Sequence, residues 1–214
     1  MSFAIEAGAK VLFTGDSITD NGRRGDKAPL GGGYVKMAHD LILAKYPQHQ
    51  LKVVNTGIGG HTVRDLAGRW TDDVINHQPD WLSIMVGIND VHRWLAKAEG
   101  ASVSPDEYAE LYRQVLERTR AESKAKLVLI QPFYISRDTY PGTHRSLVLE
   151  HLPTYQATVK ELAAEFGAHY VAFDDLFQVL LQNYAPDEFC PEPVHPHNTG
   201  HLVMAHEWLR VVNF

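Results

Sequence analysis

The sequence predicts an α/β protein, a three-layer α/β/α sandwich around a central five-stranded parallel sheet. Short apolar runs of strand length alternate with longer amphipathic segments along most of the 214 residues. This alternation is typical of a parallel sheet, and right-handed crossovers then place helices on both of its faces. The chain has no internal repeat, low-complexity tract or interdomain linker. We therefore expect a single domain over residues 1–214.

Five runs rich in apolar and β-branched residues are the expected strands. The first run, "KVLFT", ends at Gly15, which breaks the pattern and tolerates a tight turn. In chain order the expected strands are Lys10–Thr14, Leu51–Asn55, Trp81–Val86, Lys126–Gln131 and His169–Phe173.

The segments between these runs have helical periodicity, with apolar residues at i, i+3, i+4 and i+7. Ser104 is a good N-cap and Pro105 suits a first helical turn, so one helix is expected to continue from there to about Glu122. Gly167 suits the C-cap of a helix that begins near Pro153. The expected helices are Tyr34–Tyr46, 63–74, Pro105–Glu122, Pro153–Phe166, Asp174–Tyr184 and Asn198–Val212.

Three less regular stretches each follow an expected strand or precede an expected helix. They are Asp20–Gly33, Phe133–Arg145 and Ala185–His197. Parallel α/β proteins bind ligands at the carboxyl edge of the sheet, so we expect these stretches to wall a site there.

Composition and charge exclude several classes of partner. The net charge is −6 and no basic stripe is present, which disfavours nucleic acid and anionic membranes. No apolar run approaches the roughly 20 residues of a membrane helix. The N-terminal "MSFAIEAGAK" lacks the features of a signal peptide, and the single cysteine, Cys190, cannot form an internal disulfide. We expect a cytoplasmic protein that needs no cofactor.

Polar groups follow the first three expected strands. Ser17 of "GDS" is either a helix N-cap or a nucleophile. Gly60 of "NTGIGGHTV" lies either in a flexible turn or in a loop whose N–H donates to an oxyanion. Asn89 of "VGIND" belongs either to an Asx turn or to the same oxyanion hole.

A histidine-rich loop precedes the last expected helix. In "PEPVHPHNTGH", His195 lies between Pro193 and Pro196, and a histidine in so stiff a loop suits a general base. Taken alone, it is an ordinary loop histidine. A serine hydrolase needs a nucleophile, a base, an orienting acid and an oxyanion hole, and together these motifs supply candidates for them.

Four motifs in order resemble the SGNH hydrolases of the GDSL type. They are "GDS" at Gly15–Ser17, the glycine block ending at Gly60, "GIND" at Gly87–Asp90 and "VHP" at Val194–Pro196. The longer stretches "GDSITD", "GGYV", "TVRDLAGRW", "PDWLSIMVGINDVHR" and "PFYI" are similar to bacterial intracellular acetylxylan esterases of this family. The resemblance implies the flavodoxin-like fold of the family and removal of acetyl groups from carbohydrates, without a metal.

The same resemblance implies the roles of the site residues. Ser17 is the nucleophile, and the backbone N–H groups of Ser17 and Gly60 form the oxyanion hole with the side-chain amide of Asn89. His195 is first the general base and then the acid that protonates the leaving alcohol.

The orienting acid departs from the family pattern. The family usually has aspartate three residues before the histidine, whereas this chain has Glu192. Glutamate is one methylene longer, but Ser-His-Glu triads are chemically workable. We favour Glu192, with Asp187 as its rival and a partly degraded triad as a third alternative.

The acylated substrate depends mainly on the resemblance, which implies an acetylated sugar. Aromatic and polar loop residues suit sugar faces and hydroxyls better than a fatty chain: Tyr34, His92, Trp94, Tyr134, Tyr140 and His144. We take Asp16, Tyr34, His92, Trp94 and Tyr134 as substrate-binding candidates, although Asp16 also suits a residue that braces the turn. A lipase-like, lysophospholipase-like or general short-chain esterase is the alternative, and exposed aromatics are compatible with a homo-oligomer.

The sequence also contains partial patterns for two other classes of site. His197 and His201 are spaced i, i+4, and His195 and His206 lie nearby, a spacing that can bind zinc, but the chain has no HExxH. The loop "GIGGHT" could cradle a phosphate in a non-catalytic nucleotide-binding module. It lacks both the P-loop pattern and a dinucleotide-binding fingerprint.

Overall fold

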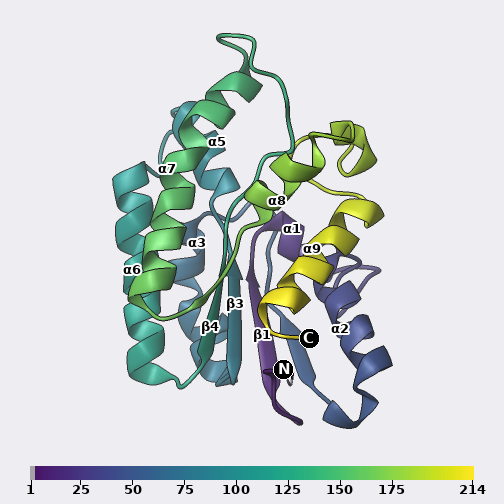
Figure 1. Ribbon diagram of the computed structural model, residues 1–214. Helices are drawn as coiled ribbons and strands as arrows, with labels where there is room; N and C mark the ends of the chain where they lie inside the picture. Colours follow the sequence, from purple (N-terminus) through teal and green to yellow (C-terminus); the bar gives the residue numbers. More distant parts are fainter. Residues whose placement is uncertain (1–2) are drawn as a thin grey trace.

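The computed structural model describes residues 3–214 and has the expected three-layer architecture. In the described part, five parallel strands form one sheet in the order β2-β1-β3-β4-β5. Helices α3, α5, α6 and α7 lie on one side of this sheet and α2 and α9 on the other (Figure 1). The expected fold class is therefore confirmed.

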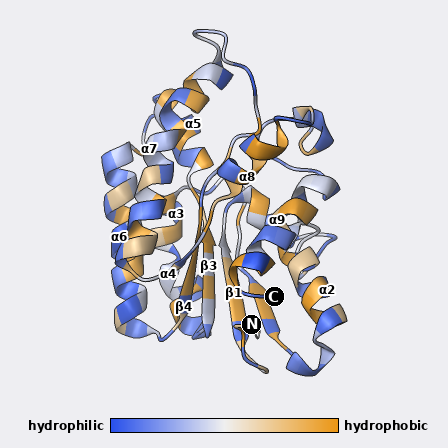
Figure 2. Ribbon diagram, viewed as in Figure 1, coloured by the Kyte–Doolittle hydropathy of each residue, from blue (hydrophilic) through white to orange (hydrophobic). Residues whose placement is uncertain are grey.

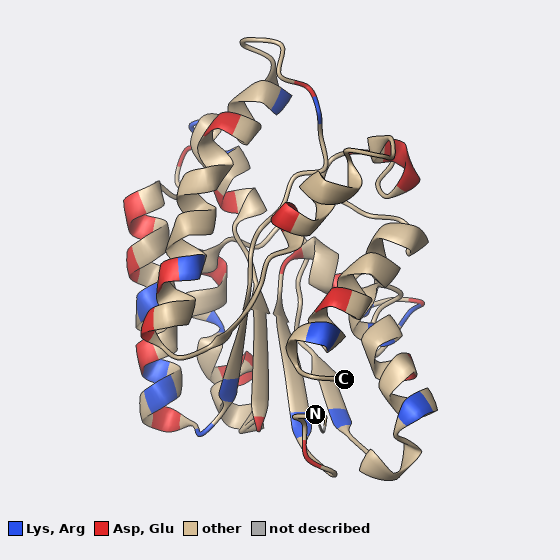
Figure 3. Ribbon diagram, viewed as in Figure 1, with Lys and Arg blue, Asp and Glu red and all other residues tan. Residues whose placement is uncertain are grey.

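The strands agree with the sequence prediction to within two residues at each end. They are β1 (Lys10–Gly15), β2 (Lys52–Asn55), β3 (Trp81–Met85), β4 (Lys126–Ile130) and β5 (His169–Val171). All residues of β3 are buried. Figure 2 shows hydrophobic strands in the centre, and Figure 3 shows that the charges on the drawn strands lie at their ends.

The helices differ more from the prediction than the strands do. They are α1 (Ser17–Asp20), α2 (Tyr34–Lys45), α3 (Val63–Gly68), α4 (Trp70–Asp73), α5 (Ile88–Leu95), α6 (Pro105–Glu122), α7 (His144–Glu165), α8 (Phe173–Leu180) and α9 (Asn198–Val211). The expected helix over 63–74 is broken at Arg69, and α1 and α5 were not expected.

Helix α7 begins nine residues before the expected start at Pro153. Thr143 caps it by accepting a hydrogen bond from the Ser146 N–H at 3.1 Å, and Pro153 lies inside the helix. A proline in a helix interior costs roughly 3 kcal/mol. Here α7 packs on both α5 and α6, and burial of Val148, Leu152 and Tyr155 offsets that cost.

The strand order places one edge of the sheet at a topological switch point. After β1 the chain crosses to β2 on one side, and after β3 it crosses to β4 on the other side. It therefore leaves β1 and β3 in opposite directions. In open α/β sheets, ligands bind in the crevice at such strand ends. Ser17 follows β1 and Asn89 follows β3, so both lie at this crevice.

Candidate active site

The turn after β1 presents Ser17. A Cβ added at Gly15 would lie 2.2 Å from the Met85 carbonyl oxygen, so only glycine fits where β1 leaves the sheet. Asp16 then caps α1: its Oδ1 accepts a hydrogen bond from the Ile18 N–H at 3.0 Å. Ser17 is thus the first residue of a short helix. Its own N–H has no acceptor among the residues that the structure describes.

A chain of hydrogen bonds joins Ser17, His195 and Glu192. Ser17 Oγ lies 2.8 Å from His195 Nε2, and His195 Nδ1 lies 2.5 Å from Glu192 Oε1. A carboxylate only accepts hydrogen bonds, so Nδ1 carries the proton and Nε2 presents a lone pair to the serine hydroxyl. This is the tautomer that a general base for Ser17 requires.

A tight turn holds Glu192 in place. Its carboxylate accepts hydrogen bonds from the backbone N–H groups of Val194 at 3.0 Å and His195 at 2.8 Å, besides that from the imidazole. Partial burial tends to raise the pKa of Glu192, but these hydrogen bonds outweigh it and the pKa is lowered. Asp187, the rival acid, contacts this region through its backbone carbonyl, which accepts a hydrogen bond from His197 Nε2 at 2.9 Å.

The glycine loop, residues 56–62, has one peptide group without partners. Within residues 3–214, each N–H of this loop has a protein acceptor except that of Gly60. For example, the Gly57 N–H donates to Asn55 at 2.9 Å and the Gly59 N–H to Asp20 at 3.1 Å. Gly60 has φ +80°, a conformation that favours glycine. The loop thus leaves one amide donor, that of Gly60, for a ligand.

Asn89 lies near the same loop on α5. Its Nδ2 donates one hydrogen bond to the His61 carbonyl at 3.1 Å, and the second N–H of the amide has no acceptor within residues 3–214. The next residue, Asp90, fixes α5 against α3 because its Oδ1 accepts from the Val63 N–H at 3.0 Å. Burial raises the pKa of Asp90 to about 7. Within the described part of the chain, the site therefore has three N–H donors without an acceptor, from Ser17, Gly60 and Asn89.

Two of the substrate-binding candidates belong to the fold instead. Asp16 is 1% exposed, and burial raises its pKa to about 7. Tyr34 is 0% exposed, and its hydroxyl lies 3.1 Å from Thr19 Oγ1. Because neither side chain has surface to offer a sugar, we correct this expectation and assign Asp16 to capping α1 and Tyr34 to the core.

Of the other candidates, His92 and Tyr134 are close enough to Glu192 to feel its charge, whereas Trp94 packs against α7. His92 is on α5 with its ring 5.9 Å from that of Tyr134 and 5.1 Å from that of His144, and its Nε2 is buried without a partner in the described part. Burial, and to a smaller extent His144, lower the pKa of His92. The Trp94 ring packs edge-on against His151 of α7 at 4.9 Å.

The histidines around α9 have structural partners. His197 caps α9 by accepting from the Thr199 N–H, and buried His201 Nδ1 accepts from the Tyr34 N–H at 3.2 Å. His201 Nε2 lies 2.8 Å from the Asn21 side chain. Among residues 3–214, no group of three or more His, Cys, Asp or Glu side chains could hold a metal ion.

His201 gives the fold a pH-dependent contribution. Burial, with smaller contributions from Lys27 and other histidines, lowers its pKa to about 4. The unfolded chain therefore binds this proton more readily, and the contribution to stability is lost as pH falls from about 6.5 towards 4. The raised pKa values of buried Asp16 and Asp90 give stability the opposite pH dependence. The contribution of His201 is therefore measured by comparing the wild type with a variant of this residue.

We expect His201→Asn to destabilise the protein more at pH 7.5 than at pH 5, by about 2 kcal/mol. Asparagine keeps an acceptor for the Tyr34 N–H but does not titrate. Urea unfolding of both proteins at the two pH values measures the difference. An equal loss at both pH values would mean that His201 titrates normally in the folded protein.

Several residues that hold the site were not found from the sequence. Arg23, Arg69 and Arg93 donate to carbonyls of the glycine loop, and Asp20 accepts from the Gly59 N–H. They come from a loop, a helix junction and two helices. Asp20, Arg69 and Arg93 lie in stretches that resemble the family, but the sequence does not show that they meet at the glycine loop. Only the folded chain brings them together.

Comparisons with known proteins agree with this geometry. The profile of the GDSL-like Lipase/Acylhydrolase family matches residues 13–203. The acetylxylan esterase of Geobacillus stearothermophilus is 38% identical over 217 residues, which cover 98% of this chain and 96% of the relative.

Solved structures give the same result. A crystal structure of that esterase matches with a TM-score of 0.88, covering 99% of this chain and 97% of its own. An alpha/beta hydrolase from the metagenome of Lake Arreo, Spain, is 31% identical, with a TM-score of 0.89 and coverage of 99% and 98%. Catalytic mutants of the Geobacillus enzyme have been solved with a serine, an aspartate or a histidine replaced, the last two being three positions apart.

Proposed function

Because this chain belongs to the GDSL-like Lipase/Acylhydrolase family, we propose that it removes acetyl groups from acetylated xylo-oligosaccharides through an acyl-enzyme on Ser17. The observation that carries the proposal is the Ser17–His195–Glu192 chain of hydrogen bonds beside three free donors. The relative that matches over nearly the whole chain is an acetylxylan esterase, described in one structure as an acetyl-xylooligosaccharide esterase.

The proposed reaction follows from the positions of these groups. His195 Nε2 takes the proton of Ser17 Oγ as the oxygen attacks the ester carbonyl, and Glu192 stabilises the imidazolium that forms. The negative charge on the former carbonyl oxygen is held by the N–H groups of Ser17, Gly60 and Asn89. The tetrahedral intermediate collapses, and His195 gives its proton to the leaving alcohol. Water, activated by the same histidine, then hydrolyses the acetyl-serine to acetate.

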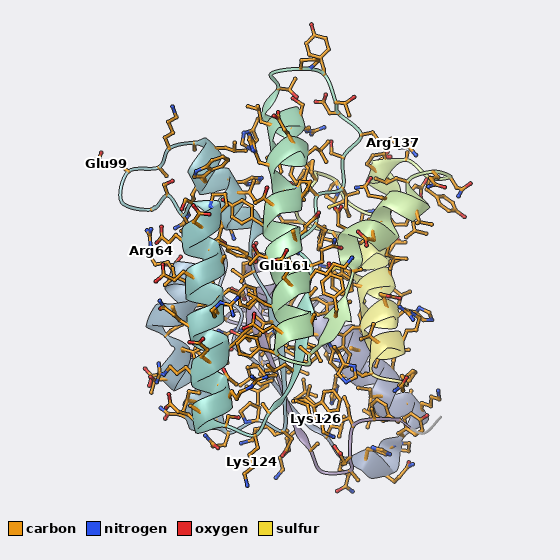
Figure 4. All side chains as sticks on the ribbon, turned by 60° about the vertical axis from the view of Figure 1, so that its left-hand side comes forward. Arg64, Glu99, Lys124, Lys126, Arg137 and Glu161 are labelled. Atoms are coloured by element: carbon orange, nitrogen blue, oxygen red, sulfur yellow. The ribbon has the colours of Figure 1, made fainter. Side chains whose placement is uncertain are left out.

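The surface around the triad suits a polar substrate. The side chains of His195 and Glu192 are 56% and 45% exposed, so the site is open enough for a branched or extended sugar. A cavity of about 300 Å³ lies against Glu192 and is lined by Arg137, Arg145, Asp138 and Asp187 among others. Figure 4 shows Arg137 at the opposite end of the molecule from Lys126, where β4 begins.

Charged and planar groups of this kind bind hydroxyls, whereas a long acyl chain needs an apolar groove. A more apolar cavity, of about 340 Å³, is lined by Trp94, Leu95, Lys97 and Ser102. None of the residues proposed for catalysis lines it. These observations favour a sugar ester over a lipid ester. Within residues 3–214, no helix is long and apolar enough to span a membrane.

Two substrate series test the proposal. We expect fast hydrolysis of p-nitrophenyl acetate that falls steeply by butyrate, together with acetate release from acetylated xylo-oligosaccharides. A preference for octanoate would contradict the sugar ester and support a lipase-like enzyme. Absence of hydrolysis in both series would contradict an esterase.

Glu192→Gln is expected to lower kcat at least about tenfold, because the neutral amide stabilises the imidazolium less well. Asp187→Asn is the matched control, since it also neutralises one carboxylate of the same loop. We expect little change in kcat from the control. Steady-state kinetics on p-nitrophenyl acetate measure both variants. The reverse pattern would transfer the orienting role to Asp187.

A further inference from the structure

Three arginines from separate parts of the chain bind the carbonyl oxygens of the glycine loop. Arg69 Nη1 donates to the Thr56 carbonyl, Arg23 Nε to that of Gly57 and Arg93 Nη2 to that of Gly60, each at 2.6 Å. Charge-assisted hydrogen bonds of this kind are about twice as strong as neutral ones. The arginines thus fix the orientation of a loop that would otherwise be flexible because of its glycines.

Arg93 acts on the peptide next to the free donor. The carbonyl of Gly60 is bound by Arg93, and the N–H of the same peptide, from His61, donates to the Ile58 carbonyl at 3.3 Å. The preceding peptide, which carries the Gly60 N–H, has no partner within the described residues. Because Gly60 is conformationally permissive, the direction of its N–H depends on how firmly the next peptide is held.

Arg93 also belongs to the helix that carries Asn89. The two residues are four apart on α5, so they lie on the same face of the helix. Arg93 Nη1 is in addition 3.6 Å from Asp65, whose carboxylate accepts from the Thr62 N–H at 2.8 Å in the capping box of α3. One short helix therefore supplies one donor and holds the loop that supplies another.

We propose that Arg93 is a positioning residue for the ester hydrolysis. It sets the direction of the Gly60 N–H relative to the Asn89 amide, so that the two donors meet at the same oxyanion. Within the described residues, Arg93 makes no hydrogen bond to Ser17, His195 or Glu192; its polar contacts are the Gly60 carbonyl and Asp65. This inference rests on the proposed function, since it assigns the free Gly60 N–H to the transition state of that reaction.

The test compares Arg93→Met and Arg93→Lys with Arg64→Met. Arg64 is a matched control because it also bridges a carboxylate, that of Glu107, and backbone carbonyls, those of Gly100 and Ser102. It is on α3 and lies beside α6 (Figure 4), and within the described residues its side chain donates no hydrogen bond to the glycine loop. Its side chain is 39% exposed, against 35% for Arg93.

We expect Arg93→Met to lower kcat for p-nitrophenyl acetate about tenfold, less than the roughly 10²–10³-fold loss when a donor is removed outright. KM should change by less than about twofold, because the donors act mainly in the transition state. The pH profile of kcat should keep its inflection, since His195 is untouched. Arg93→Lys should recover only part of the rate because lysine lacks the planar fork that reaches two acceptors.

Three results would overturn the proposal. An unchanged kcat in folded Arg93→Met would do so, and so would an equal fall in Arg64→Met. A loss that appears in KM rather than in kcat would also do so, and Arg93→Lys supplies this readout if the methionine variant does not fold. Failure of the proposed function has a different signature, because the wild-type protein would then lack a hydrolysis rate that depends on Ser17.

Discussion

Ser17→Ala is expected to lower kcat for acetyl ester hydrolysis by about 10⁴–10⁶-fold, because the variant lacks the hydroxyl proposed to form the acyl-enzyme. Ser17 Oγ is 2.8 Å from His195 Nε2 and makes no other hydrogen bond within residues 3–214, so its loss should leave the fold intact. Pre-steady-state and steady-state hydrolysis of p-nitrophenyl acetate measure the change. Thermal unfolding serves as the check on folding.

A double variant makes this expectation sharper. Residues that act as one catalytic unit are strongly non-additive, so Ser17→Ala combined with His195→Ala should be no worse than either single variant. If the two losses multiplied, Ser17 and His195 would act independently. If Ser17→Ala retained the wild-type rate, Ser17 would only be the first residue of α1.

Asn89→Ala is expected to lower kcat by about 10²–10³-fold while KM stays nearly constant, because the amide acts on the transition-state oxyanion. The variant also loses the hydrogen bond to the His61 carbonyl, which by itself contributes roughly 1 kcal/mol to stability. Steady-state kinetics and urea unfolding separate the two effects.

Asn76→Ala is the matched control for Asn89. The Asn76 amide also donates one hydrogen bond, to Asp72 at 3.2 Å, but it lies after α4, on an exposed surface. We expect its kcat to equal that of the wild type. A large rise in KM with unchanged kcat in Asn89→Ala would instead make Asn89 a substrate-binding residue.

The sheet could be predicted from the sequence because buried parallel strands are short apolar runs with clear ends. The short helices could not. Helix α1 has four residues and α5 has eight, too short for a periodic pattern to be decisive. Pro153 suggested a helix start, but packing of α7 on its neighbours outweighed the local preference of proline.

The residues proposed for catalysis were easier to predict than the residues that hold the glycine loop. Ser17, Gly60, Asn89 and His195 lie in motifs with unusual local composition, at strand ends or between prolines. The arginines at 23, 69 and 93 are far apart in the sequence and meet only around the folded glycine loop. The orienting acid was open between two residues on sequence grounds, and the structure brings the carboxylate of Glu192 to His195.

The central claim is that Ser17 is the nucleophile of an acetyl esterase, and covalent labelling tests it most directly. The protein is treated with a fluorophosphonate, the modified residue is located by peptide mass spectrometry, and acetate release from acetylated xylo-oligosaccharides is measured on the same sample. We predict one phosphonyl group per chain, on Ser17, and loss of acetate release in proportion to labelling. Label on another residue, or full acetate release from fully labelled protein, would contradict the account.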